Sequence, residues 1–215
     1  MTTNKKRALF ILRISFLFTT DNSHYVKLYR LYKFKINTLN LTNNLTDFPK
    51  NVTIFQLGGL YISTYVKNDF TVSSNKNYLD VELIYNYLHD EAYWSKGIPL
   101  RLVEKSIQNS ICFGVFAGDP EKGKSKQVGF GRIITDSSTF AYLADVFILN
   151  EFRGLDLGKS LVQTMINCPS IREVRRILLA TKDAHGLYKQ YDFQAVKDKN
   201  LFMDINQKDI YNKLS

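Results

Sequence analysis

Cysteine, histidine and proline are all scarce in this chain. Its 215 residues include two cysteines, three histidines and four prolines. Cys112 and Cys168 are too few for a disulfide framework, and the scattered histidines do not complete a metal site around them. We therefore expect no metal and no disulfide. Cys112 stands inside an apolar run, so we expect it to be a small buried core residue.

Acidic residues are scarce only in the first third of the chain. Residues 1–68 hold ten Lys and Arg against two Asp, whereas residues 69–215 hold 19 Lys and Arg against 18 Asp and Glu. The net charge of +9 therefore belongs almost entirely to the first segment. Because the rest is near neutral, we expect no nucleic-acid partner. One alternative is a basic arm, formed by residues 1–68, that binds nucleic acid. This alternative predicts that the binding depends on salt.

The apolar run Ala8–Phe18 is too short to cross a membrane. A spanning helix needs about 20 apolar residues, and Arg13 interrupts this run. No small-residue cleavage site follows it cleanly, as a secretory signal would require. We expect a cytoplasmic protein that does not associate with membranes.

The residue pattern changes near Asp69, where we place a domain boundary. Residues 1–68 are rich in Lys, Asn, Tyr, Phe, Ile and Thr and lack a sustained period, which indicates a low-complexity extension, either accessory or disordered. Residues 69–215 alternate between stretches with the hydrophobic period of a helix and stretches with the alternating pattern of a strand. Strands are expected at 70–73, 111–117, 128–135, 141–149, 177–181, 193–196 and 201–205, and helices at 80–89, 100–109, 158–167 and 184–191. This order predicts an α/β fold with a mixed sheet and an antiparallel meander on one side.

The segment 144–161 carries the clearest functional pattern. A nearly continuous apolar strand ends, a turn with Arg153 and Gly154 follows, and an amphipathic helix begins near Gly158. The first N–H groups of a helix lack intrahelical partners, and the helix dipole adds positive potential there. Such a turn is suited to a pyrophosphate. A P-loop and a dinucleotide-binding loop both need a different glycine spacing.

Two motifs in this region resemble the GNAT superfamily of N-acetyltransferases. Arg153, Gly154 and Gly158 resemble its acetyl-coenzyme A signature, Arg/Gln-x-x-Gly-x-Gly/Ala. The segment Ala184–Phe193 resembles the family helix Ala-x-x-Leu-Tyr-x-x-x-Gly-Phe. Small bacterial members have segments similar to 93–94, 97–100 and 141–146, and the resemblance covers about residues 69–205.

The resemblance implies a central mixed sheet, flanked by helices, with one splayed pair of parallel strands. Acetyl-coenzyme A would lie between the strands 141–149 and 177–181 and pass its acetyl group to an amine by direct attack. Tyr188 would protonate the leaving thiolate, and Asp145 or Glu82 would act as the base. Trp94 and Tyr142 would line the acceptor pocket. The family's cofactor-binding positions correspond here to Val146, Phe147, Ile148, Arg153, Gly154, Leu155, Asp156, Leu157, Gly158, Lys159, Ser160 and Thr181.

Three positions depart from the family pattern. Asp156 replaces the central glycine of the signature, Thr181 replaces a common asparagine and Asp192 replaces a glycine. The Asp156 change favours an alternative, a GNAT-like domain that is catalytically weak or inactive and binds coenzyme A poorly. The identity of the amine is left open, and so is assembly into a homodimer.

Overall fold

The computed structural model of the chain describes residues 69–207 and 209–214 in full. Before Asp69 it describes only the backbone of four strands, β1 (Ile14–Ser15), β2 (Leu31–Lys35), β3 (Val52–Leu57) and β4 (Leu60–Lys67). Each pairs antiparallel with the next, and β4 pairs with the first strand of the domain. The rest of the extension 1–68 lies outside the described residues, so the boundary near Asp69 stays a prediction.

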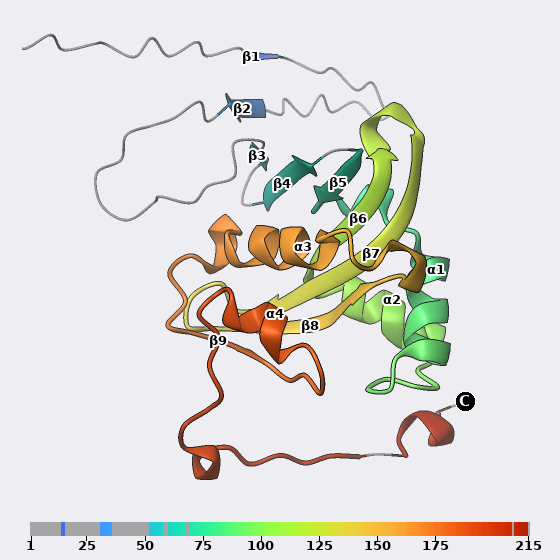
Figure 1. Ribbon diagram of the computed structural model, residues 1–215, viewed down its shortest axis with the longest axis vertical. Helices are drawn as coiled ribbons and strands as arrows, with labels where there is room; N and C mark the ends of the chain where they lie inside the picture. Colours follow the sequence, from blue (N-terminus) through green and yellow to red (C-terminus); the bar gives the residue numbers. More distant parts are fainter. Residues whose placement is uncertain are drawn as a thin grey trace, which may run out of the picture.

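Five strands of a mixed sheet form the centre of the domain (Figure 1). Neighbours from β5 to β8 are antiparallel, whereas β8 and β9 are parallel. The expected mixed sheet with an antiparallel meander is therefore confirmed. The strands are β5 (Phe70–Ser73), β6 (Ile111–Asp119), β7 (Lys124–Thr135), β8 (Phe140–Ile148) and β9 (Arg176–Leu179).

Four helices cover the two faces of this sheet (Figure 1). The Asp80 carboxylate accepts a hydrogen bond from the Leu83 N–H at 2.9 Å and caps α1, as its position predicted. The helix then widens into a π turn, Tyr87–Glu91, whose Tyr87 and Leu88 are buried. The helices are α1 (Val81–Asn86), α2 (Leu100–Gln108), α3 (Leu157–Ile166) and α4 (His185–Lys189).

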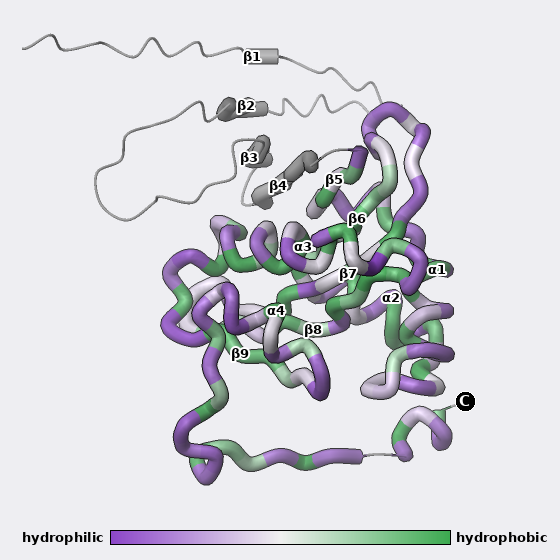
Figure 2. Tube along the Cα trace, in the orientation of Figure 1, coloured by the Kyte–Doolittle hydropathy of each residue, from purple (hydrophilic) through white to green (hydrophobic). Residues whose placement is uncertain are grey.

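The sheet divides the core into two clusters because neighbouring strand residues point to opposite faces. Phe113 and Ile148 pack on the side of α3, whereas Cys112 and Phe147 pack on the side of α1 and α2. Figure 2 shows hydrophobic residues along these central strands. The buried position expected for Cys112 is confirmed, and burial raises the pKa of its thiol to about 11. This thiol is therefore an inert core group.

The two strands expected at 193–196 and 201–205 are wrong. The structure has irregular backbone at the first position and a short 3₁₀ turn, Lys199–Leu201, followed by extended backbone at the second. Alternating apolar residues predict a strand only if a neighbouring strand can accept its hydrogen bonds. Within residues 69–207, no strand beyond β9 offers that neighbour.

The parallel pair β8–β9 opens at one end. Its pairing runs from Phe140 opposite Arg176 to Leu143 opposite Leu179, but β8 continues to Ile148. A β-bulge lies in the part of β8 beyond its pairing with β9, because Arg132 of β7 opposes Ala144 while Phe130 opposes Phe147. The bulge leaves a gap between the two strands, at the place that the resemblance implied.

No helix in the described part of the chain is both long and apolar enough to cross a membrane.

Candidate functional site

A groove of about 550 Å³ lies at the open end of the β8–β9 pair. Its walls come from the end of β8, the turn before α3, the α1–α2 connection and α4. Of the residues expected at the site, this groove brings together Trp94, Val146, Phe147, Ile148, Arg153, Gly154, Asp156, Leu157, Gly158, Lys159 and Tyr188. Trp94 and Tyr188, which are 94 positions apart in sequence, thus share one cavity.

The turn before α3 presents backbone N–H groups to this groove. Gly154 has φ +82°, a left-handed conformation that favours glycine, and a Cβ there would face open space. The N–H groups of the first helical turn, from Leu157 to Lys159, have no partner inside the helix. Together with the helix dipole they give this end of the groove the chemistry that suits an anion.

Asp156 occupies the left-handed N-cap position of α3, with φ +58°. Its carboxylate makes no capping hydrogen bond and instead pairs with the Lys159 ammonium at 2.7 Å. The pair is about half exposed. Asp156 therefore neutralises the side chain that would otherwise add positive charge beside the N–H groups.

Arg153 is held in place by two hydrogen bonds. Its guanidinium donates to the Ile148 carbonyl at 3.2 Å and to the Tyr87 hydroxyl at 3.3 Å. The Tyr87 ring stacks on Phe147, with centroids 3.7 Å apart. These contacts fix the turn against the end of β8 and leave the guanidinium on the wall of the groove.

Tyr188 projects from α4 into the inner part of the groove. It is 8% exposed, and burial, together with the nearby Tyr93, Asp183 and Tyr142, raises the pKa of its hydroxyl to about 12. The hydroxyl is therefore protonated at neutral pH. A protonated phenol beside a leaving thiolate has the state that a general acid needs.

Asp145 lies at the bulge of β8, with φ +53°. Its carboxylate accepts from the Arg132 guanidinium at 2.5 Å and from the Trp94 indole N–H at 3.0 Å. Arg132 also donates to the Ser110 hydroxyl at 3.1 Å. Both carboxylate oxygens are thus engaged, and the cluster ties the α1–α2 connection to the sheet.

Six of the expected site residues do not line the groove, and Asp145, described above, is one of them. Glu82 faces a separate hollow of about 300 Å³ on α1. The Thr181 hydroxyl accepts from the Ala184 N–H at 3.1 Å, and the Ser160 hydroxyl donates to the Asp156 carbonyl at 3.3 Å. Leu155 is exposed at the turn. Tyr142 is close enough to Tyr188 to affect its pKa.

The groove also contains residues that the motifs did not identify. Glu91 and Asp183 give it acidic groups, and Tyr87 supplies the hydroxyl that positions Arg153. Tyr87 and Glu91 belong to the π turn after α1. Only the aromatic and acidic residues clustered at 87–94 hint at this wall in the sequence.

A family model described as an acetyltransferase (GNAT) domain matches residues 109–195. A Gibberella zeae protein whose name assigns it as an acetyltransferase is 30% identical over 138 residues, which cover 58% of this chain and 78% of that protein. An uncharacterized N-acetyltransferase of Pyropia yezoensis is 34% identical over 131 residues, covering 60% of this chain and 72% of its own length.

A solved structure shows the same similarity. A crystal structure from Xanthomonas campestris pv. campestris, assigned to an acetyltransferase of the GNAT family, is 39% identical to this chain. The match covers 68% of this chain and 99% of that one, with a TM-score of 0.62.

Proposed function

The chain belongs to the GNAT family of acetyltransferases, and from this premise we propose that it transfers an acetyl group from acetyl-coenzyme A to an amine by direct attack. The observation that carries the proposal is the groove itself. One end offers the N–H groups of the α3 turn with Arg153, and the inner part holds the buried, protonated Tyr188.

The groove residues fit the chemical groups of acetyl-coenzyme A. The anionic pyrophosphate suits the backbone of Gly154 to Lys159 and the side chain of Arg153. The end of β8 from Val146 to Ile148 lies beyond the pairing with β9, so on that side it offers backbone groups to the amide-bearing arm. The thioester supplies an activated acetyl carbon when it is bound.

In the proposed reaction the neutral amine nitrogen bonds to the acetyl carbon and the carbon–sulfur bond breaks. The Tyr188 hydroxyl donates its proton to the departing thiolate. The amine loses a proton to a groove carboxylate or to water. We propose Glu91 and Asp183 for this role, because both line the groove, while Asp145 is engaged by Arg132 and Trp94.

Two measurements test the function. Acetyl-coenzyme A should raise the melting temperature of the chain, because a ligand that binds only the native state stabilises it. Release of free thiol in a screen of amines should then identify an acceptor. Binding without thiol release from any amine would favour the alternative of a weak or inactive domain, and no thermal shift would contradict the proposal.

Asp156→Gly is expected to tighten acetyl-coenzyme A binding by about fivefold, or about 1 kcal/mol. The substitution removes a carboxylate from the anion-binding turn, frees the Lys159 ammonium and suits the left-handed backbone. Because the effect is electrostatic, it should shrink as salt rises. Calorimetric titration of both forms at two ionic strengths measures it. Equal affinities at low salt would show that the Asp156–Lys159 pair turns away from the phosphates.

A further inference from the structure

Trp94, the single tryptophan of the chain, stands on the wall of the groove. Its side chain is 43% exposed, and its ring lies edge-on to the Tyr93 ring, with centroids 5.0 Å apart. Burial raises the pKa of the Tyr188 hydroxyl, and the nearby Tyr93 raises it further. Trp94 therefore lies on the side of the groove that holds Tyr188, where an acceptor amine would approach.

A hydrogen bond to Asp145 orients the Trp94 ring. The indole N–H donates to one carboxylate oxygen at 3.0 Å, and the other oxygen accepts from the Arg132 guanidinium. The side chains of Asp145 and Arg132 are 10% and 16% exposed, so little water reaches them. Polar contacts are stronger where water is excluded. A group that covers this cluster therefore also holds Trp94 in place.

The last described turn of the chain, Tyr211–Lys213, lies beside the cluster, below the α1–α2 connection in Figure 1. The half-buried Tyr211 packs against the core cluster of α1 and α2. Burial raises the pKa of its hydroxyl, and the nearby Asp145 carboxylate raises it further. The Asn212 side chain lies beside Gly97 of the α1–α2 connection, 3.9 Å from the position that a Cβ would take there. The turn therefore covers the Asp145 cluster.

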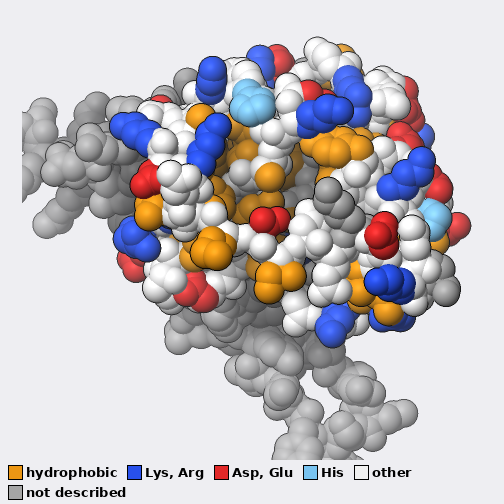
Figure 3. All heavy atoms as spheres, turned by 90° about the horizontal axis from the view of Figure 1, so that it is seen from below, with side chains coloured by type: hydrophobic (Ala, Val, Ile, Leu, Met, Phe, Trp, Pro, Cys, Tyr) orange, Lys and Arg blue, Asp and Glu red, His pale blue; other side chains and the backbone are white. Residues whose placement is uncertain are grey.

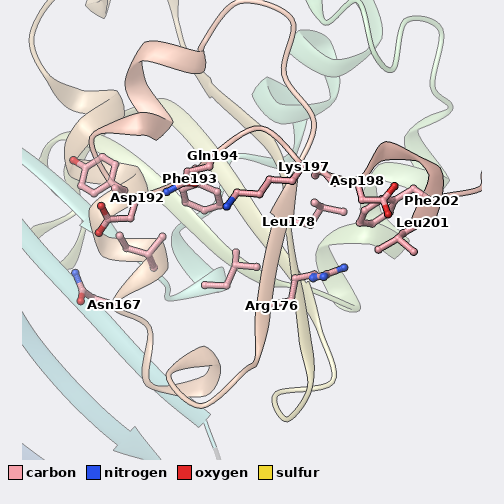
Figure 4. A pocket seen from close by; sticks show the side chains of 14 residues that line it. Asn167, Arg176, Leu178, Asp192, Phe193, Gln194, Lys197, Asp198, Leu201 and Phe202 are labelled. Carbon is pink, nitrogen blue, oxygen red and sulfur yellow. The ribbon is translucent and has the colours of Figure 1, made fainter.

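The chain that leads to this turn is anchored earlier, at β9. The Phe202 ring lies 5.6 Å from the Arg176 guanidinium and lines a cavity of about 670 Å³ beside β9. Figure 4 shows Leu178 of β9 between Phe193 and Phe202 in this cavity. Residues 203–207 then cross the face seen in Figure 3, where Lys, Arg, Asp and Glu side chains are intermixed around hydrophobic ones. These residues are all exposed, so the turn is held by its own contacts and by the Phe202 anchor.

We propose that Tyr211 is a positioning residue for the acetyl acceptor, because its ring keeps water from the Arg132–Asp145 pair. The pair then holds the Trp94 ring in one orientation in the groove wall. This role rests on the proposed acetyl transfer, since Trp94 contacts an acceptor only if the groove binds one. Without the Tyr211 ring, water reaches Asp145 and weakens its bond to the indole. The amine is then held less well, whereas the end of the groove at Arg153 is unchanged.

The first test is kinetic. Tyr211→Ala is expected to raise the KM of the amine by about tenfold, roughly the effect of losing one hydrogen bond to a charged group. Both kcat and the affinity for acetyl-coenzyme A should stay near their native values. Met203→Ala, a change in the same tail at a side chain that is 98% exposed, is the matched control and should behave as the native chain does. Tyr211→Phe keeps the ring and should also behave as native.

The second test needs no acceptor. Because Trp94 is the single tryptophan, its fluorescence reports its surroundings directly. Tyr211→Ala is expected to shift the emission to longer wavelength and to increase quenching by acrylamide, whereas Met203→Ala is not. Circular dichroism checks that each variant is folded. If Tyr211→Ala is not folded, Tyr211→Leu, which keeps an apolar side chain over the core, takes its place.

Three results would overturn the role of Tyr211. They are native fluorescence in Tyr211→Ala, an equal change in Met203→Ala, and an unchanged amine KM beside altered fluorescence. A native chain that releases no thiol with any amine contradicts the proposed function instead. In that case the fluorescence comparison alone decides whether Tyr211 positions Trp94.

Discussion

Tyr188→Phe is expected to lower turnover by about 10²-fold while leaving acetyl-coenzyme A affinity nearly unchanged. The substitution keeps the ring that packs against Phe193 and removes only the hydroxyl. That hydroxyl is the buried proton donor at the inner part of the groove. Single-turnover rates and calorimetric affinity, measured on the same preparations, separate loss of chemistry from loss of binding.

Tyr78→Phe provides a matched control for this experiment. Tyr78 packs edge-on against Phe116, away from the groove, and loses the same atom on substitution. It should retain the native rate. If Tyr188→Phe also turns over at the native single-turnover rate, another group or water protonates the thiolate, and Tyr188 has only a packing role.

The pH profile gives a further readout of the same residue. Because the pKa of Tyr188 is raised to about 12, its hydroxyl stays protonated through the neutral and mildly alkaline range. Deprotonation of Tyr188 should therefore not lower the rate over the rising pH range in which the amine acceptor loses its own proton. The ordinary pKa of tyrosine is about 10. A loss of activity with that pKa would contradict the raised pKa of Tyr188 if the loss disappeared in Tyr188→Phe.

Arg132→Met is expected to lower the free energy of unfolding by about 3 kcal/mol. The side chains of Arg132 and Asp145 are 16% and 10% exposed, so removing the cation leaves a largely buried carboxylate without its charged partner. For a domain of this size that corresponds to a fall in melting temperature of about 6–12 °C. Denaturant titration and thermal melts measure both quantities.

Two further variants show whether the loss comes from the stranded charge. Arg132→Met/Asp145→Asn replaces the carboxylate by a neutral amide that also tolerates the left-handed backbone, and it should recover part of the stability. Lys122→Met breaks an exposed ion pair with Asp119 and should cost less than about 1 kcal/mol. Equal losses for Arg132→Met and Lys122→Met would mean that the Asp145 cluster does not hold the α1–α2 connection.

Local features of this protein follow from the sequence because their causes lie within a few residues. Asp80 caps α1 through the N–H three residues later, and the turn from Arg153 to Gly158 leads directly into α3. The order of strands and helices up to α4 follows from hydrophobic periods in the same way. These features predicted the mixed sheet, and the turn that leads into α3, without knowledge of distant contacts.

The tertiary structure alone decided which distant residues complete the site. Arg153 and Tyr87 meet across 66 positions, and Trp94 meets Asp145 across 51. No short-range pattern contains such pairs, and so Glu82 was expected at the groove while Glu91 was not. Residues 201–205 show the same limit, because their alternating apolar residues match a strand but no strand beyond β9 within residues 69–207 offers them a neighbour. Whether a segment becomes a strand depends on a hydrogen-bonding partner, and that partner is chosen only when the chain folds.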